Sequence, residues 1–414
     1  MLTHLWISRR MRLGTDGIAV GAVIAVTGVA LALTVMELTL GIVVGFKDEI
    51  KRKLMGFDAQ ISIEAAYDPY TRTQAATIAP SSALMDIVGT EAPGAESRLV
   101  LRLPGILKTD SDFEGIVFVG QSPESDFTFE RGNIVEGSWP DYASDSCRND
   151  IVISRATASA LGLAVGDKVY STYIIDEAVK MRRNTVAAIF EADFGEYDRT
   201  VAYASLAALQ SIAGLDPDEG NRLELRGMPE EMISPAASKM ESAMLAAMGN
   251  GTLDAYYPVQ TVEQSGAIYF NWLSLLDTNV AVIFCLMLCV AAFTLVSSLF
   301  ILVLDNVPAI GILRSMGASR RLIRSIFVDL GMRIVLRGMI AGNILGLGLL
   351  LIQKYTRMIP LDPEAYYLNC VPVEIRPWSF VALNIGVALA AWLVLWIPAR
   401  TASSVDPAKT INFE

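Results

Sequence analysis

The chain has 414 residues, of which 53% are hydrophobic and 19% are charged. Its mean hydropathy of +0.43 is too high for a soluble protein of this size, and its charge is too high for a bundle of membrane helices throughout. Between residues 46 and 270 there are 34 acidic and 19 basic residues. Such a block repels nucleic-acid phosphates, so the sequence argues against nucleic acid as a partner and favours a membrane protein with one long hydrophilic domain.

The N-terminal region combines arginines with a long apolar run. We predict a cytoplasmic segment over 1–16, a membrane-spanning helix over 17–45 and a helical stalk that continues to residue 57. The apolar run exceeds the ~7–15 residues of a signal-peptide core, and no Ala-x-Ala cleavage site follows it. The run is therefore expected to stay in the protein as the first span.

Residues 58–262 alternate short strand-like and helix-like segments, which predicts a large α+β domain, inserted between the first two spans and divided into two subdomains. Helices are predicted over 81–88 and 229–248, and a further helix is predicted to end at Gly162. The predicted strands include AQISIEA, SRLVLRLPGIL, GIVFVG, DIVIS and TVAAIF.

Three further apolar segments after this domain are long enough to cross a membrane. The predicted spans are 275–304, 327–352 and 379–398, with an external loop over 353–377 and a cytoplasmic tail over 399–414. Arginine and lysine residues flank the spans on one side, so both termini are expected inside and the large domain outside. Glycines at four-residue spacing, Gly338, Gly342 and Gly346, are expected to let a neighbouring helix approach closely.

The segment IGILRSMGASRRLIRSIF, residues 310–327, lies between the second and third spans. Apolar residues recur at helical spacing on one face and arginines fall on another, which predicts a short helix at the membrane surface. Gly317 is expected to break this helix, and Ser319 is expected to cap the helix that then enters the bilayer. The alternative interpretation is a solvated loop with ordinary cytoplasmic arginines.

No enzymatic site is visible in the sequence. The phosphate-binding pattern GxxxxGK[ST] is absent, so ATP hydrolysis is expected in a separate subunit. The single histidine, His4, is expected at the membrane interface. Glu191–Asp198 carries four carboxylates; calcium is one reading, but a solvated acidic turn is preferred and no metal is predicted. Cys147 and Cys370 are expected outside the membrane, and their pairing is left open.

Four stretches carry a resemblance that extends over essentially the whole chain. They are VMELTLGIVVGFKDEIKRKLMGFDAQISI, GILRSMGASRRLIRSIF, AYYLNCVPVEIRP and IPARTASSVDPAKTINFE. In the order one helix, large external domain, three helices, they resemble the FtsX-like permeases of ABC transporters, and most closely the lipoprotein-releasing permeases of the LolC and LolE type. The resemblance implies a helical membrane part with a MacB-like periplasmic α+β domain.

The resemblance also implies a function and partners. The chain would lie in the inner membrane of a Gram-negative bacterium, as one subunit of a permease homodimer or heterodimer. A separate LolD-like ATPase would bind ATP and Mg²⁺, while this chain would bind no cofactor itself. The substrate would be a lipoprotein, extracted from the outer leaflet and released towards a LolA-like periplasmic carrier.

Two sets of residues take roles from the resemblance. The segment 308–324 would form a cytoplasmic coupling helix seated on the ATPase. Its candidate contact residues are Ile310, Leu313, Arg314, Gly317, Arg320, Arg321 and Arg324. A lipid cavity between the first two spans would be lined by Ile42, Val43, Phe46, Ile50, Ile268 and Phe270. Ordinary core contacts between the two helices are the alternative for this second set.

One stretch departs from the pattern of LolC-like members, whose carrier-binding hairpin is rich in proline and phenylalanine. The corresponding stretch here, VYSTYIIDEAVKMRRNTV, is short and has no proline, which leaves carrier binding, a LolE-like role and a homodimer open. Two other functions remain as alternatives: a MacB-like efflux or peptide-export permease, and an FtsX-like regulator of a cell-wall hydrolase. The short segment before the first span predicts that no ATPase is fused to the chain.

Overall fold

The protein is described by a computed structural model that covers residues 20–65, 77–125, 128–175, 177–192, 194–253 and 255–402. The chain divides into two compact units. The first unit consists of Met1–Glu49, Trp272–Pro360 and Cys370–Glu414, and the second of Ile50–Asn271 and Leu361–Asn369.

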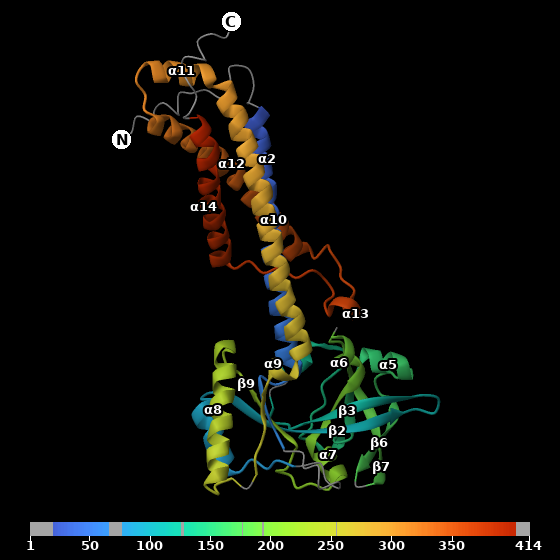
Figure 1. Ribbon diagram of the computed structural model, residues 1–414. Coiled ribbons are helices and arrows are strands. Elements are labelled where there is room, and N and C mark those ends of the chain that lie inside the picture. Colours follow the sequence, from blue (N-terminus) through green and yellow to red (C-terminus); the bar gives the residue numbers. More distant parts are fainter. Residues whose placement is uncertain are drawn as a thin grey trace. The chain divides into compact units, whose positions relative to one another are not determined.

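The first unit is helical (Figure 1). Its helices are α2 (Val20–Phe57), α10 (Ala267–Asp305), α11 (Val307–Ser315), α12 (Arg320–Thr356) and α14 (Pro377–Ala402), of which α2 and α10 continue into the second unit. Within the described residues, four helices are long and apolar enough to cross a membrane, namely α2, α10, α12 and α14. The prediction of four candidate spans is therefore confirmed.

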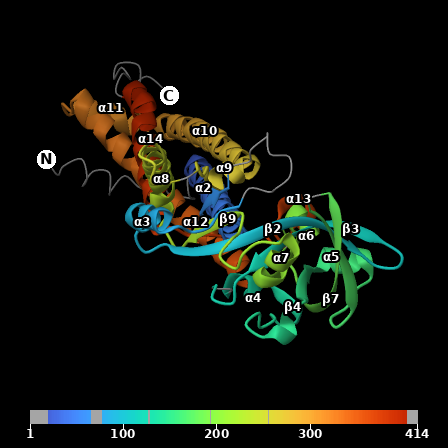
Figure 2. The same ribbon diagram turned by 90° about the horizontal axis from the view of Figure 1, so that it is seen from below.

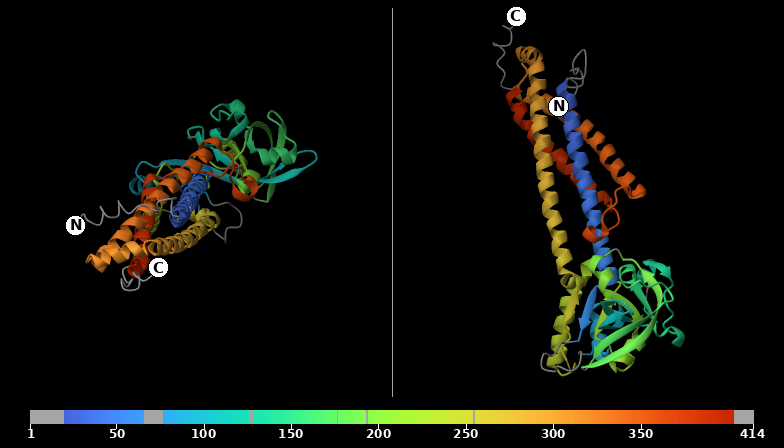
Figure 3. Two further views of the ribbon diagram at one scale, coloured as in Figure 1. Left: turned by 90° about the horizontal axis from the view of Figure 1, so that it is seen from above. Right: turned by 90° about the vertical axis from the view of Figure 1, so that its right-hand side faces the viewer.

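Small residues bring the long helices together. A Cβ atom on Gly338 of α12 would lie 2.8 Å from the Val29 Cβ of α2, and one on Gly346 would overlap the carboxylate of Glu37. The glycine stripe thus makes the close helix approach that its spacing predicted, and it leaves Glu37 fully buried. Figure 3 shows the molecule from two further sides, and in both views α2 (blue) runs beside α10 (yellow).

The second unit contains a mixed sheet. In the described part of the chain the sheet has ten strands. Nine of them follow the order β10-β1-β9-β2-β3-β8-β5-β7-β4, and the tenth, β6, pairs with both β2 and β7. The strands are β1 (Ile61–Glu64), β2 (Glu96–Lys108), β3 (Phe113–Gln121), β4 (Ile134–Gly137), β5 (Asp150–Ser154), β6 (Lys168–Ile175), β7 (Ala178–Phe190), β8 (Val201–Ser205), β9 (Arg222–Arg226) and β10 (Val259–Thr261). Most pairs are antiparallel, whereas β3–β8 and β5–β7 are parallel.

Further helices belong to the second unit. They are α3 (Ser82–Glu91), α4 (Thr128–Gly132), α5 (Arg155–Leu161), α6 (Gly195–Thr200), α7 (Leu206–Ala213), α8 (Glu230–Gly249), α9 (Val262–Ser265) and α13 (Pro363–Tyr366), with a 3₁₀ turn at Asp145–Cys147. Gly162 adopts a left-handed φ of 65° at the end of α5, as the sequence predicted. The strand and helix content agrees with the predicted α+β domain.

Two hydrophobic cores lie along the sheet, one in each half of it. The long strand β2 runs through both halves. Its first residues pair with β9 and its last residues with β3 and β6. One core packs Phe118 and Tyr173 beneath α5 and α7. The other packs Ile63 of β1 with Leu84 of α3 and Met240 of α8. Figure 2 shows α5 and α7 beside β3 and β7, and α3 beside α8.

Candidate functional site

The segment between the second and third spans folds as two helices around a tight turn. α11 ends at Ser315, and Gly317 has a left-handed φ of 91°. The Ser319 hydroxyl accepts the Leu322 amide N–H at 3.3 Å and caps α12. The glycine break and the serine cap are as predicted. Arg320 begins α12, as a cap at Ser319 requires, so the coupling segment 308–324 consists of α11 and the first residues of α12.

The face that α11 leaves open differs from the one expected. Ile310 is fully buried in the helical core, and Leu313 and Arg314 are half-buried. By contrast, Ile312 is 62% exposed and Met316 is 79% exposed. The apolar surface available to a partner is therefore formed by Ile312 and Met316. Periodicity indicates which residues share a face, but it does not tell which face packs against the bundle.

The candidate arginines of α12 lie in different surroundings. Arg320 and Arg321 are exposed, whereas Arg324 is half-buried. The Arg324 guanidinium carbon lies 4.6 Å from the centroid of the Trp396 ring of α14, a cation–π contact. Arg324 therefore packs against a spanning helix, while Arg320 and Arg321 remain accessible.

Three of the candidate lipid-cavity residues belong to the first unit. Ile42 and Val43 are half-buried. Phe46 packs edge-on against Trp272 of α10, with the ring centroids 5.4 Å apart. Trp272 was not singled out from the sequence, because a tryptophan just before an apolar run is also the ordinary residue of a membrane interface.

The other three candidates belong to the second unit. Ile50 is fully buried, so its side chain is already covered by protein atoms. Phe270 is half-buried, whereas Ile268 is 84% exposed. Of these three residues, only Ile268 has a largely exposed side chain.

An aromatic cluster surrounds the end of α2 in the second unit. Phe57, the last residue of α2, lies 4.6 Å from Tyr197 and 4.8 Å from Phe129 between ring centroids. The Tyr197 hydroxyl lies 3.1 Å from the Phe57 carbonyl oxygen, to which it donates. Phe194 contacts Tyr269 at the start of α10, at 5.1 Å. The end of α2 and the start of α10 are thus fixed to the same aromatic group.

A buried charge cluster lies immediately after α2. The Asp58 carboxylate accepts hydrogen bonds from Arg102 of β2 at 3.0 Å, from Arg222 of β9 at 2.6 Å and from the Ser265 hydroxyl of α9 at 2.9 Å. Glu224, which is 1% exposed, is paired with Arg98 at 2.9 Å and with Arg102 at 3.0 Å. The cluster therefore ties the residue after α2 to two central strands and to the helix that precedes α10.

The charges of this cluster hold one another ionised. Burial alone would raise the pKa of Glu224, but the arginine charges, led by those of Arg98 and Arg102, outweigh burial and place the pKa well below its usual value. Burial would likewise lower the pKa values of Arg98 and Arg102, but the Glu224 charge raises both. For Arg222, burial and the neighbouring Arg102 charge lower the pKa.

The stretch VYSTYIIDEAVKMRRNTV forms the hairpin of β6 and β7. Ile174 lies opposite Val179 in the strand register, and their exposed fractions are 70% and 65%. Met181 of the same hairpin is 52% exposed. The hairpin thus presents an apolar surface although it has no proline.

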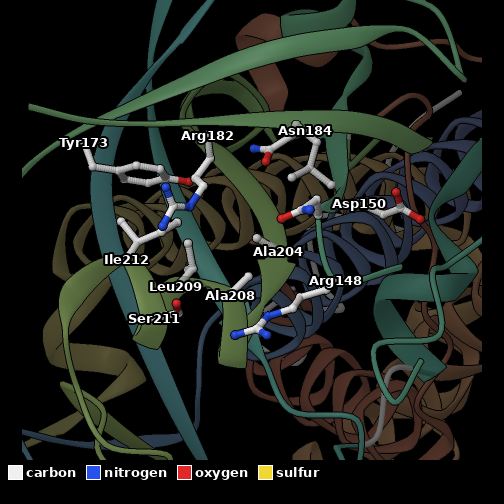
Figure 4. Close-up of a pocket in the computed structure, with 12 residues that line it drawn as sticks. Arg148, Asp150, Tyr173, Arg182, Asn184, Ala204, Ala208, Leu209, Ser211 and Ile212 are labelled. Carbon is white, nitrogen blue, oxygen red and sulfur yellow. The ribbon is translucent and has the colours of Figure 1, made fainter. Parts of the chain in front are cut away.

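A pocket of about 320 Å³ opens beside this hairpin (Figure 4). Arg182 lies beside Tyr173, and Arg148 lies on the other side of Ala204 in this view. Burial raises the pKa of Tyr173 to about 12, so the phenol is neutral at physiological pH. The lining named for this pocket includes neither histidine nor cysteine.

The acidic turn at Glu191–Asp198 makes hydrogen bonds and an ion pair within the fold. The Asp198 carboxylate accepts the amide N–H groups of Ala192 and Phe194, each at 3.0 Å, and Glu191 pairs with Arg155 at 3.2 Å. Among the residues that the structure describes, no three histidine, cysteine or carboxylate side chains gather as a metal site. All four cysteines are free thiols.

Residues 281–407 match the family model described as FtsX-like permease C-terminal. Over 407 residues the chain is 26% identical to the lipoprotein-releasing system transmembrane protein LolC of Xylella fastidiosa, covering 94% of this chain and 93% of that protein. It is 24% identical to LolC of Neisseria meningitidis over 414 residues, 94% of each. It is also 27% identical to LolE of Haemophilus influenzae over 300 residues, 68% of each.

Among solved structures, the periplasmic region of MacB from Actinobacillus actinomycetemcomitans covers 51% of this chain at 11% identity, with 92% of that chain matched and a TM-score of 0.33. A TM-score at this level does not establish a shared fold. The family match includes α11, its turn at Gly317 and α12, and the LolC similarity extends over both compact units. The chain therefore carries an FtsX-like permease domain and is similar, along nearly its whole length, to the lipoprotein-releasing permeases of the LolC type.

Proposed function

We propose that this chain is the permease subunit of an ATP-driven transporter that extracts lipoproteins from the outer leaflet of the inner membrane and releases them towards a periplasmic carrier. The observation that carries the proposal is the similarity to LolC over 94% of the chain. The arginine distribution supports a topology with both termini in the cytoplasm and the second unit in the periplasm.

A separate ATPase would bind ATP and Mg²⁺ and dock on the turn between α11 and α12. The exposed side chains of Ile312 and Met316 supply the apolar contact, and the exposed Arg320 supplies positive charge beside it. An apolar anchor with charges around it is the usual arrangement of a helix that enters a groove on a partner. Leu313 and Arg314, which are half-buried, would connect this contact to the bundle.

Motion of the helices would then reach the periplasmic domain through the ends of α2 and α10. Both ends are fixed within the second unit, by the aromatic cluster around Phe57 and by the charge cluster around Asp58. Because Asp58 binds β2, β9 and α9 at once, displacing α2 alone would break ion pairs. We infer that the helix ends and the sheet move together.

The lipid part of the substrate would enter near the outer ends of α2 and α10. Ile42 and Val43 of α2, which are half-buried, supply apolar surface there, and the buried Phe46 packs against Trp272 of α10. A second permease subunit, identical or related, would complete the cavity. The exposed Ile174 and Val179 of the β6–β7 hairpin would contact the carrier, because exposed apolar pairs are favoured at protein interfaces.

Depletion of the chain in its host tests this proposal. Outer-membrane lipoproteins are expected to accumulate in the inner membrane, as measured by membrane fractionation, and an intact copy of the chain should restore their sorting. Normal sorting together with increased sensitivity to drugs or peptides would favour a MacB-like exporter instead. Normal sorting with a division defect would favour a regulator of a cell-wall hydrolase.

A further inference from the structure

A second pocket, of about 370 Å³, lies between the first turns of α12 and the last turns of α14. Arg321 and Arg324 line it from α12, and Trp392 and Trp396 line it from α14. The two tryptophans pack edge to face at 5.5 Å. A close contact at Gly331, where a Cβ would lie 2.6 Å from a Leu395 methyl, fixes the two helices beside it. The walls of the pocket are therefore well defined.

The pocket carries uncompensated positive charge. In the part of the chain that the structure describes, no carboxylate lies within ion-pair distance of Arg321 or Arg324. The pocket also contains Asp329, but this carboxylate is paired with Arg333 at 2.8 Å. Two guanidinium groups thus remain for a ligand, and their planar donor arrays suit the oxygens of a phosphate.

The tryptophans place the pocket at a membrane surface. Trp378, which is 84% exposed, stands near the start of α14. At 1.5 Å per residue, Trp396 lies about 27 Å further along this helix, close to the ~30 Å thickness of the hydrocarbon core. Tryptophan is enriched at both membrane interfaces. Trp396 therefore marks the interface opposite to that of Trp378, which is the cytoplasmic one in the topology of the proposed function.

The lining also changes in polarity along α12. Beyond the arginines, Val328 and Met332 continue the same wall one and two helical turns further on. A cationic end followed by an apolar wall matches a phospholipid, which has a charged phosphate attached to acyl chains. A soluble protein partner would match the arginines but not an apolar wall that extends towards the bilayer.

We propose that this pocket binds an anionic phospholipid of the cytoplasmic leaflet, with Arg321 and Arg324 on the headgroup phosphate and Trp392, Val328 and Met332 along an acyl chain. The Trp396 indole N–H, which is buried and has no acceptor in the described residues, is a further donor at this site. The assignment of the leaflet rests on the proposed topology, whereas the lipid preference itself can be measured whatever the transporter carries.

Tryptophan fluorescence of the full chain in lipid nanodiscs tests the site. Phosphatidylglycerol with brominated acyl chains, mixed into phosphatidylcholine, should quench the fluorescence more than brominated phosphatidylcholine does. The Arg324→Gln variant should weaken the preference for phosphatidylglycerol roughly fivefold, because a basic residue near an anionic lipid contributes about 1 kcal/mol. Arg324→Lys should retain most of the preference.

Arg357→Gln is the matched control, since Arg357 follows the opposite end of α12 and is exposed; it should leave the preference unchanged. Replacing Trp392 and Trp396 by Phe should remove the selective quenching. Equal quenching by both lipids, or no effect of Arg324→Gln, would overturn the proposal. So would loss of the preference on adding inorganic phosphate, which would indicate a free anion. Retained lipid preference with loss of bound ATPase in Arg324→Gln would assign the pocket to the protein partner.

Discussion

Glu224 is the central residue of the charge cluster that follows α2. It is 1% exposed and lies within 3.7 Å of four arginines. Replacing Glu224 by Gln removes the negative charge that these arginines share. We expect Glu224→Gln to destabilise the second unit by about 3–5 kcal/mol, because it leaves buried charges without a partner. Thermal unfolding of the full chain in detergent, followed by circular dichroism, measures the effect.

The same residue predicts a pH dependence. Because the pKa of Glu224 is lowered by folding from its usual value of 4.5, its stabilising contribution is fully present above pH 4.5 and is lost progressively as the pH falls below it. The unfolding temperature of the native chain should therefore fall below pH 4.5 more steeply than that of Glu224→Gln. Glu96→Gln, an exposed position on β2, is the control; equal pH profiles for the native chain and Glu224→Gln would contradict this role.

The glycine stripe of α12 gives a third prediction at this scale. A Cβ at position 346 would overlap the Glu37 carboxylate, whereas one at Gly348 meets no atom within 4 Å. Gly346→Ala should therefore destabilise the helical unit by about 1–3 kcal/mol, a typical cost of overpacking. Gly348→Ala should leave the unfolding temperature unchanged. Equal unfolding temperatures for the two variants would show that α2 and α12 are not closely packed at this position.

At the scale of elements, the turn between α11 and α12 carries the proposed contact with the ATPase. The double variant Ile312→Asp/Met316→Asp places charges at two exposed apolar positions, so the fold should persist while the docking surface is lost. We expect the ATPase to no longer copurify with the permease. Met232→Asp, at an exposed methionine of α8, is the control. An unchanged yield of bound ATPase with the double variant would remove the turn from the interface.

The β6–β7 hairpin carries the proposed carrier contact. Ile174→Asp/Val179→Asp should lower crosslinking to the periplasmic carrier about tenfold or more, as expected for the loss of two apolar anchors. Association with the ATPase should not change, because the hairpin belongs to the second unit. If crosslinking persists at the native level, the carrier binds elsewhere. The proline-free hairpin would then belong to a permease subunit that does not bind the carrier through this hairpin.

Local sequence signals predicted the elements that depend on local chemistry. Residues within the same short segment were enough to predict four features. These are the four apolar helices, the end of α5 at Gly162, the cap at Ser319 and the close approach at Gly346. β9, with the sequence RLELR, was missed. Its charged side chains suggest an exposed strand, but they are satisfied by arginines and carboxylates of β2 and of the residue after α2. Such partners come from distant parts of the sequence.

The site was predicted less well for a related reason. Helical periodicity grouped Ile310 with Leu313, but the bundle covers Ile310 and leaves Ile312 and Met316 exposed. Arg324 was grouped with Arg320 by charge, whereas Trp396, more than seventy residues later, draws it against α14. The sequence thus indicated the correct segment, and tertiary packing determined which of its side chains remain accessible.

At the scale of the whole molecule, α2 and α10 pass through both units. They are therefore the elements through which the proposed ATPase contact on the first unit would act on the second unit. The similarity to LolC spans both units as well. A transporter of this kind must convert ATP hydrolysis into removal of a lipid-anchored protein from the bilayer. Neither unit alone is expected to achieve this.

The most direct test reconstitutes the chain with its ATPase in proteoliposomes that contain an acylated lipoprotein, with the soluble carrier outside. We predict that ATP releases the lipoprotein into the soluble fraction, and that release is lost when the chain carries Ile312→Asp/Met316→Asp. Full ATP hydrolysis with all of the lipoprotein retained in the vesicles would contradict the account.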